Sequence, residues 1–353
     1  MNGKLFSSNY RILKTLGQDK FSETFLAQDH RLLSHRRYVI KKFRPILGNL
    51  QGQATKLGFY QEASVLKRLS GDSCQIPRLY EYFMDGEDFY LVREWIPGIT
   101  LEQKIRQQGR LAETEVKNVL SSILSVLKYI HSYGIVYRDL KPSSIVLRQV
   151  DWLGKLRGRN LVPVPIYFSG VKELAKEKIS VIQNSFYVLA KQKEYIPPEQ
   201  ERGKSVYASD LYSLGLTAIF MLTAKTPSEL EFDYSINRMM WQGEASELKT
   251  NLVRIIDRAI CPSPQARFAS AEEMLQALHS QLVLIPRSVE NQPTKKFWSN
   301  SAIFNSEIKV TLILFLLALG IIGIFFSFLN FDFTQLIENY NWELESQEVD
   351  RKN

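Results

Sequence analysis

The chain has 353 residues, of which 45% are hydrophobic and 23% charged, a composition that is typical of a globular protein and excludes a largely disordered one. The net charge of +8 would suit a nucleic acid or an anionic membrane surface, but the basic residues are scattered, so we expect no nucleic-acid partner. Cys74 and Cys261 lie far apart and fit neither a disulfide framework nor a metal-binding pattern.

Residues 10–96 show strand patterns interrupted by one helical stretch. The segments Y-V-I-K-K-F from Tyr38 and F-Y-L-V-R-E-W-I from Phe89 are rich in β-branched and aromatic residues, as strands are. Residues 59–69 carry a helical pattern. We therefore expect a lobe built mainly on a β-sheet.

Residues 97–282 are predicted to be mainly helical. Residues 115–132 place their apolar side chains on one face of a helix, residues 210–222 form an apolar helix, and residues 270–282 form an amphipathic one. A strand-rich part followed by a helical part predicts an α+β protein of two lobes.

The last part of the chain has a different character. Residues 283–309 form a polar linker with prolines, and residues 310–329 contain no charged residue. As a helix, residues 310–329 would be about 30 Å long, enough to cross the hydrocarbon core of a bilayer. A buried core helix is the alternative, but such helices rarely run so far without a charge. We therefore predict a single transmembrane helix.

The charges around this segment predict its orientation. Basic residues precede it at Arg287, Lys295, Lys296 and Lys309, whereas the tail, residues 330–353, is acidic. Because positive charge stays on the cytoplasmic side, we expect a single-pass protein of the cell membrane with its N-terminal part in the cytoplasm and its C-terminus outside.

The string Y-R-D-L-K-P-S-S-I-V-L, residues 137–147, resembles the catalytic loop of Ser/Thr protein kinases, H-R-D-x-K-P-x-N-I. Similar strings stand on both sides in the order of that family: L-G-Q-D-K-F-S-E-T-F-L-A from Leu16, V-I-K at 39–41, F-Y-Q-E-A-S-V-L, Y-I-P-P-E-Q at 195–200, S-D-L-Y-S-L-G from Ser209 and Q-A-R-F. Over residues 10–282 the chain thus resembles the bacterial, eukaryotic-like (Hanks-type) Ser/Thr protein kinases with a C-terminal membrane anchor. The resemblance implies a two-lobed protein-kinase fold.

The resemblance also implies roles for individual residues. Asp139 and Lys141 occupy the catalytic loop, and Lys41, Glu62 and Gly17 occupy nucleotide-binding positions. Structural positions of the family fall on Glu199, Asp210, Arg267 and Phe168, with Glu199 pairing with Arg267. We expect the Glu199–Arg267 pair to be buried and the Lys41–Glu62 pair to lie near solvent at the cleft.

Several positions of the family pattern are degenerate. In P-I-Y-F-S-G-V-K-E-L, residues 165–174, Tyr167 stands where an aspartate holds the Mg²⁺ that bridges the phosphates. A neutral phenol is a poor ligand for this cation, which prefers carboxylate oxygen. Further replacements are Ser144 for the metal-binding asparagine, Asp19 and Ser22 for glycines of the Gly-rich loop, Gln192 for a substrate-seating threonine, and Arg93 at the gatekeeper position of the adenine pocket. We expect no metal site, and no cofactor is certain: ATP binding remains open and Mg²⁺ binding is not expected.

Two functions remain open. The first is a membrane-anchored pseudokinase that acts as a scaffold or regulator of a protein partner, with an active kinase as one class of partner and residues 310–329 in the lipid bilayer. The alternative is an active or weakly active Ser/Thr kinase that transfers the γ-phosphate of ATP to protein hydroxyls. In the first case Lys41–Glu62 is a structural bridge, and Asp139 is a remnant bonded within its loop.

Residues 148–166 form a longer hairpin than the family's, either a solvated surface loop or a contact for a partner or lipid headgroups.

Overall fold

The computed structural model describes residues 5–6, 10–18, 22–29, 36–44, 50–71, 73–149, 161–168, 170–174, 193–233, 235, 238–245 and 250–280. All of them belong to one compact unit, Met1–Leu284. The predicted transmembrane helix at residues 310–329, most of the linker before it and the acidic tail after it belong to the second unit, outside the described residues. Within the described part of the chain, no helix combines the length and the apolar character that a membrane span requires.

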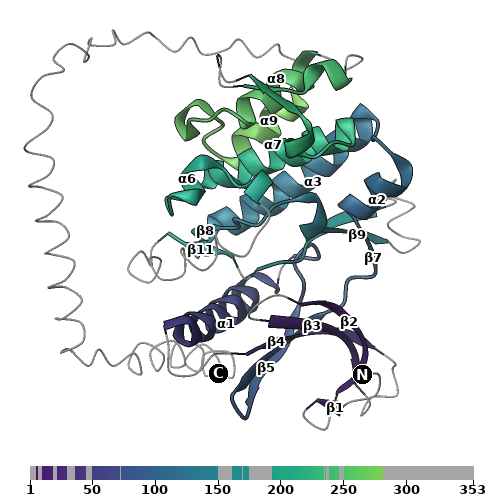
Figure 1. The fold of residues 1–353 in the computed structure, drawn as a ribbon, viewed down its shortest axis with the longest axis vertical. Coiled ribbons are helices and arrows are strands. Elements are labelled where there is room, and N and C mark those ends of the chain that lie inside the picture. Colours follow the sequence, from purple (N-terminus) through teal and green to yellow (C-terminus); the bar gives the residue numbers. More distant parts are fainter. Residues whose placement is uncertain are drawn as a thin grey trace, which may run out of the picture. The chain divides into compact units, whose positions relative to one another are not determined.

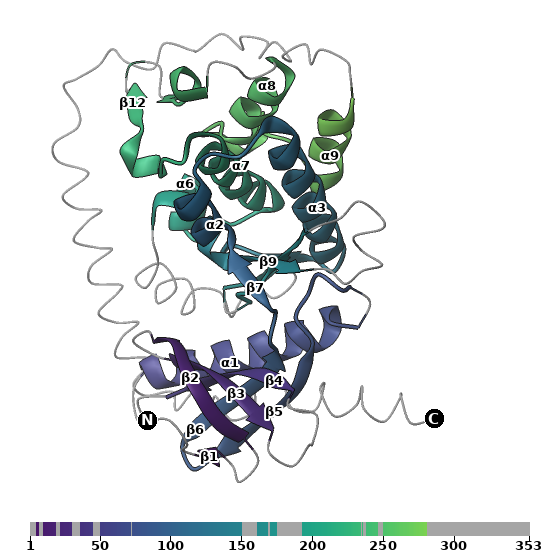
Figure 2. The ribbon, with the colours of Figure 1, turned by 90° about the vertical axis from the view of Figure 1, so that its right-hand side faces the viewer.

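The N-terminal lobe is an antiparallel sheet covered on one face by a long helix (Figures 1 and 2). Its described strands follow the order β1-β2-β3-β4-β6-β5. Their bounds are β1 Leu5–Phe6, β2 Tyr10–Gln18, β3 Ser22–Asp29, β4 Arg37–Phe43, β5 Leu79–Asp85 and β6 Asp88–Glu94.

The helix α1, Leu50–Leu69, covers the inner face of this sheet. The ring of Phe59 in α1 contacts Phe43 of β4, with ring centroids 5.5 Å apart, and Phe89 of β6, at 5.0 Å. The helix ends at the predicted residue but begins earlier than the predicted Phe59. Its first turns, L-Q-G-Q-A-T-K, lack an apolar stripe and consist largely of residues with good helix propensity, so periodicity alone missed them.

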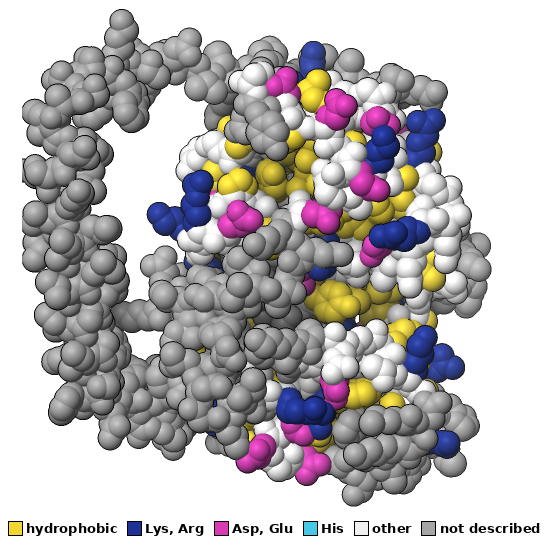
Figure 3. All heavy atoms as spheres, in the orientation of Figure 1, with side chains coloured by type: hydrophobic (Ala, Val, Ile, Leu, Met, Phe, Trp, Pro, Cys, Tyr) yellow, Lys and Arg dark blue, Asp and Glu magenta, His cyan; other side chains and the backbone are white. Residues whose placement is uncertain are grey.

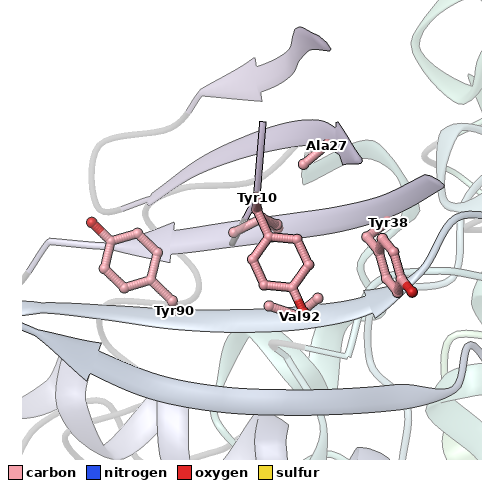
Figure 4. Packing of buried hydrophobic residues seen from close by; sticks show 6 residues of the cluster. Tyr10, Ala27, Tyr38, Tyr90 and Val92 are labelled. Atoms are coloured by element: carbon pink, nitrogen blue, oxygen red, sulfur yellow. The ribbon is translucent and has the colours of Figure 1, made fainter. Parts of the chain in front are cut away.

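The outer face of the sheet has its own hydrophobic cluster. Figure 4 shows Tyr10, Ala27, Tyr38, Tyr90 and Val92 of this cluster on neighbouring strands. The rings of Tyr10 and Tyr38 meet edge to face at 5.6 Å. Because successive side chains of a strand point to opposite faces, Tyr38 and Ile40 lie on this face, whereas Val39, Lys41 and Phe43 face α1.

The C-terminal lobe is a helical bundle around α7. Its helices are α2 Leu101–Gln108, α3 Glu113–Ser132, α6 Pro198–Glu201, α7 Tyr207–Thr223, α8 Thr250–Ala259 and α9 Ala271–His279. Helix α7 is buried on nearly all sides, as expected for a helix that is apolar all round. At Gly215 a Cβ would lie 2.7 Å from the side chain of Ile260, so glycine lets the end of α8 approach α7 closely.

Short strands connect this bundle to the N-terminal lobe. Strands β7 Gly98–Thr100, β9 Ile145–Gln149 and β10 Leu161–Pro165 form one small sheet, and β8 Ile135–Val136 pairs with β11 Lys172–Glu173. A further hairpin joins β12 Glu231–Asp233 and β13 Arg238–Met240. The register of β9 against β10 runs from Ile145 opposite Pro165 to Gln149 opposite Leu161, so the two ends of the long 148–166 hairpin are paired and its middle lies outside the described residues.

The described surface mixes both signs of charge. On the face in Figure 3, Lys and Arg side chains are interspersed with Asp and Glu side chains over both lobes. The fold itself, a sheet lobe followed by a helical lobe, confirms the predicted α+β architecture.

Candidate functional site

The first part of the site is an ion pair between the sheet and α1. Nζ of Lys41 on β4 lies 2.7 Å from Oε2 of Glu62 on α1. Only 8% of Lys41 and 3% of Glu62 is exposed, so the prediction that this pair lies near solvent was wrong. The reason is local: Lys41 is on the face of the sheet that α1 covers, and its ammonium also lies 4.4 Å from the ring centroid of Phe43.

A second cation lies on the same face of the sheet. Arg93 of β6 is opposite Val39 in the register that places Leu91 opposite Lys41, so Arg93 and Lys41 point to the same side. Arg93 is only 5% exposed. Burial lowers the pKa of Arg93, while the charge of Glu62 opposes this shift, with smaller contributions from Tyr167 and Tyr137.

The catalytic-loop string is held in place by Asp210 at the start of α7. Its carboxylate accepts hydrogen bonds from the backbone N–H groups of Tyr137, at 2.8 Å, and Arg138, at 2.7 Å. Nε2 of His131 lies 2.8 Å from the same carboxylate. Arg138 has φ of 67°, which a non-glycine residue adopts only when its surroundings impose it. Asp210 thus has a structural role, as predicted: its carboxylate fixes the backbone of the catalytic-loop string.

Within the loop, Ser144 closes a tight turn. Its hydroxyl donates to the carbonyl of Lys141 at 2.8 Å and accepts from the N–H of Lys141 at 3.0 Å. Nζ of Lys141 lies 3.9 Å from Oδ1 of Asp139, and Asp139 is buried. Both atoms of the Ser144 hydroxyl group are therefore engaged in holding the loop.

Tyr167 and Phe168 follow β10 and point to different environments. Phe168 is fully buried and meets the ring of Tyr137 edge to face at 5.3 Å, in agreement with its predicted structural role. Tyr167 is 37% exposed, and its backbone N–H donates to the hydroxyl of Tyr137 at 3.1 Å. Tyr167, which the sequence pattern predicts at the aspartate position of the family, is thus partly exposed to solvent.

The residues of the Gly-rich string are only partly described. Gly17 lies on β2 opposite Thr24, and a Cβ there would meet no atom within 4 Å. Ser22 is buried as the first residue of β3 and pairs with Phe43. Asp19 and Gln192 lie outside the described residues. The structure thus places Gly17 one residue before the end of β2 and Ser22 at the start of β3.

The predicted Glu199–Arg267 pair is present and buried. Nη1 and Nη2 of Arg267 donate to the two carboxylate oxygens of Glu199 at 2.7 and 3.0 Å. Arg267 also donates to three backbone carbonyls, those of Cys261, Pro262 and Ala208. Burial raises the pKa of Glu199, but the hydrogen bonds from Arg267 and Ser209 outweigh this effect and hold that pKa below its usual value.

The contacts between α1 and the C-terminal lobe were not foreseen from the sequence. Nε2 of Gln61 donates to the carbonyl of Val171 at 2.8 Å, and Nη1 of Arg68 lies 3.1 Å from Oε2 of Glu173. Residue types such as Gln and Arg on a helix carry no signal of a partner more than a hundred positions away. These contacts fix α1 in the position in which Glu62 meets Lys41.

The side chains of the site do not fit a kinase-type Mg²⁺. Such an ion prefers carboxylate oxygens, whereas Tyr167 offers a phenol and Ser144 a neutral hydroxyl that also bonds within its loop, so Asp139 is the carboxylate among these three residues. Across the described ranges, no group of three or more His, Cys, Asp or Glu residues could hold a metal ion.

Comparison with known proteins shows which family the chain resembles. The protein kinase domain family matches residues 10–280. Serine/threonine-protein kinase PknA of Nostoc sp. is 43% identical over 291 residues, which cover 82% of this chain and 50% of that protein. Serine/threonine-protein kinase C of Synechocystis sp. is 41% identical over 292 residues, with 82% and 53% covered. PrkC of Bacillus subtilis is 28% identical over 280 residues, with 77% and 40% covered.

The solved structures agree at the level of the fold. A crystal structure of Rad53 in complex with AMP-PNP matches with a TM-score of 0.56 at 20% identity, covering 76% of this chain and 64% of the other. The chain spans about half the length of the curated relatives it matches. Taken with the two-lobed fold, the matches establish that the chain belongs to the protein kinase family, among the bacterial Hanks-type Ser/Thr kinases.

Proposed function

We propose that this chain is a pseudokinase, which acts on a protein partner through its conformation and not by phosphoryl transfer. The observation that carries the proposal is Tyr167. Phosphoryl transfer consists mostly of positioning and charge neutralisation, and the metal ions that bridge the phosphates need anionic ligands. Tyr167 puts a neutral phenol at the main ligand position, and the hydroxyl of Ser144, at the second one, is already bonded within its loop.

The contacts of α1 support this role, because they join α1 to both lobes of the domain. The Lys41–Glu62 pair joins α1 to the sheet, Gln61 and Arg68 join α1 to the C-terminal lobe, and Tyr137 packs against Phe168. A scaffold needs a surface of persistent shape. These contacts hold α1 against both the sheet and the C-terminal lobe.

The partner in this proposal is a protein, with an active kinase as one class of partner. The proposal includes a membrane anchor at residues 310–329, in the cell membrane with the kinase-like domain in the cytoplasm. It is supported by the absence of charge in this segment and by the charge difference between its two flanks.

The alternative is an active or weakly active Ser/Thr protein kinase. Asp139, Lys141 and the Lys41–Glu62 pair are retained, and the curated relatives are named serine/threonine-protein kinases. In this case Asp139 would act as the base at the acceptor hydroxyl. The replacement of the metal ligands by Tyr167 and Ser144 argues against this alternative.

Replacement of the chromosomal gene by variants separates the two functions. Asp139→Asn should behave as the wild type in any phenotype that deletion of the gene causes, because the pseudokinase needs no base. Arg267→Ala, which breaks a buried pair, is the control that should reproduce the deletion. If Asp139→Asn reproduces the deletion while its melting temperature is unchanged, the chain functions as an enzyme and the proposal is wrong.

A further inference from the structure

Four exposed arginines lie at one end of the N-terminal sheet. In the strand registers, Arg11 of β2 is opposite Gln28 of β3, and Gln28 is opposite Arg37 of β4. The residue after Arg37 is opposite Glu94 of β6, and the backbone N–H of Glu94 donates to the carbonyl of Arg78 at 2.8 Å, just before β5 begins. We call the exposed arginines at this end the arginine cluster: Arg11, Arg36, Arg37 and Arg78.

Positive charge is in excess at this end of the sheet. Among the described residues, none of the ion pairs includes a guanidinium group of the arginine cluster. Three carboxylates are near: Glu94 pairs with Arg148 at 3.1 Å, and Glu81 accepts a hydrogen bond from the hydroxyl of Tyr10. The third, Asp29, is buried opposite Tyr10. Even when all three are set against the arginine cluster and Arg148, two positive charges remain in excess.

The opposite end of the same sheet is acidic. The turn between β5 and β6 runs between the paired residues Asp85 and Asp88 and also contains Glu87. Asp88 pairs with Lys42 and Arg44, whereas Asp85 and Glu87 are exposed. Charge on the sheet is therefore unevenly distributed, with the arginine cluster at one end and this acidic turn at the other. Such a lobe takes a preferred orientation beside a negatively charged surface.

A tyrosine lies between two arginines of the cluster. The ring centroid of Tyr80 is 4.8 Å from Cζ of Arg36 and 6.0 Å from Cζ of Arg78. Tyr80 is half-buried, and its ring meets that of Tyr38 edge to face at 5.1 Å. Guanidinium groups match phosphate oxygens with several charge-assisted donors, and tyrosine rings are enriched at the level of lipid headgroups. This combination of side chains suits the headgroup region of a bilayer.

We propose that the arginine cluster binds the phosphate groups of anionic lipids, so that this end of the sheet docks on the cytoplasmic leaflet. The inference goes beyond the pseudokinase function, and it rests on the proposed membrane anchor at residues 310–329. Between Ser280 and that segment lie 29 residues, which span at most about 100 Å even when fully extended. The anchor thus keeps the domain near many headgroups, which favours a lipid over a freely diffusing acidic protein as the ligand.

Chemical modification of arginines in lipid nanodiscs tests this contact. The full-length chain is reconstituted in discs of phosphatidylcholine and in discs of phosphatidylcholine and phosphatidylglycerol in about equal parts. Phenylglyoxal then modifies accessible arginines, and mass spectrometry gives a rate for each. We expect the arginine cluster to react at least about fivefold more slowly in the anionic discs, and about 0.5 M NaCl to remove this difference by screening. Arg202 and Arg254, exposed in the helical lobe, should react equally in both discs.

A double variant tests the role of individual arginines. Arg36→Gln with Arg78→Gln removes the two charges beside Tyr80 and should lower the ratio of docked to undocked domain about thirtyfold, measured from the reaction rates of Arg11 and Arg37. The matched control, Arg202→Gln with Arg254→Gln, removes two exposed charges elsewhere and should leave those rates unchanged. All four substituted side chains are exposed, so both double variants should melt near the wild-type temperature.

Each failure has its own signature. Equal reaction rates of the arginine cluster in neutral and anionic discs would overturn the inference, and so would equal protection of Arg202 and Arg254. Polyglutamate, added to neutral discs, is the probe for an acidic protein: protection by polyglutamate but not by anionic discs would make a protein the ligand and refute the lipid contact. A chain without the proposed anchor would instead elute apart from discs of phosphatidylcholine in size-exclusion chromatography.

Discussion

The hydroxyl of Tyr137 accepts a hydrogen bond from the backbone N–H of Tyr167 at 3.1 Å. The two residues occupy positions where the family pattern has His and Asp. The bond uses the main chain of Tyr167, so it does not depend on the side chain at this position. The ring of Tyr137 also packs against Phe168. Tyr137 therefore holds the degenerate segment in place by one hydrogen bond and one ring contact.

Substitution of the two tyrosines should have unequal effects on stability. Tyr137→Phe removes the buried acceptor and should lower the free energy of unfolding by about 1 kcal/mol, the usual net value of such a hydrogen bond. Tyr167→Phe keeps the backbone N–H and should change stability by about 0.5 kcal/mol or less. Urea unfolding of both variants measures the difference. A larger loss for Tyr167→Phe would contradict the arrangement described here.

Breaking either buried ion pair, Arg267–Glu199 or Lys41–Glu62, should lower the free energy of unfolding, and the first loss should be the larger. Arg267→Ala removes the counter-charge of Glu199 and leaves three backbone carbonyls without their donor, so we expect a loss at or above about 5 kcal/mol. Lys41→Ala leaves Glu62 buried, but Arg93 remains near it, so the loss should be near about 3 kcal/mol. Denaturant unfolding checks the order, and a larger loss for Lys41→Ala would reverse the structural roles assigned to the pairs.

The stability of the domain should fall at acid pH in part because of Glu199. Its pKa is lower in the folded protein than its usual value of 4.5, so this carboxylate contributes stability above pH 4.5. That contribution is lost as the pH falls through the lower, folded-state pKa. Glu199→Gln should therefore show a weaker loss of stability between about pH 5 and pH 3 than the wild type. Equal pH dependence in both proteins would show that Glu199 does not carry this contribution.

The membrane topology is open to a direct assay. The charges on both sides of residues 310–329 predict a cytoplasmic N-terminal part and a C-terminus outside. A reporter that is active only outside the cytoplasm should give a signal when it is fused after Asn353, and no signal when it is inserted after Leu284 with the rest of the chain kept. A signal from the second fusion alone would mean that the orientation is reversed.

The sequence predicted correctly those contacts that lie within one motif, or that join two motifs which follow each other in a recognisable order. The strings around Asp139, Glu199 and Arg267 predicted a bonded loop and a buried pair, and the structure has both. Periodicity identified α3 and α7 but missed the first turns of α1, whose residues largely favour a helix without forming an apolar stripe.

Burial and long-range contacts were harder to predict. The burial of Lys41 and Glu62 depends on how closely α1 packs against the sheet, which no pattern within either segment reports. The same holds for Gln61 and Arg68, whose partners lie far along the chain. Arg93 was identified as a large charged residue at its position, but that its Nε meets no acceptor among the described residues is visible only in three dimensions.

The central claim, that the site cannot transfer phosphate, is tested most directly by incubating the purified full-length chain with labelled ATP, a generic protein acceptor and either Mg²⁺ or Mn²⁺. We expect the wild type, Asp139→Asn and Tyr167→Asp to incorporate equally little label. Restoring one carboxylate does not suffice, because Ser144 remains bonded in its loop and small misplacements of reacting groups are costly. Labelling of the chain itself or of the acceptor by the wild type, abolished by Asp139→Asn, would contradict the account and establish the chain as an active kinase.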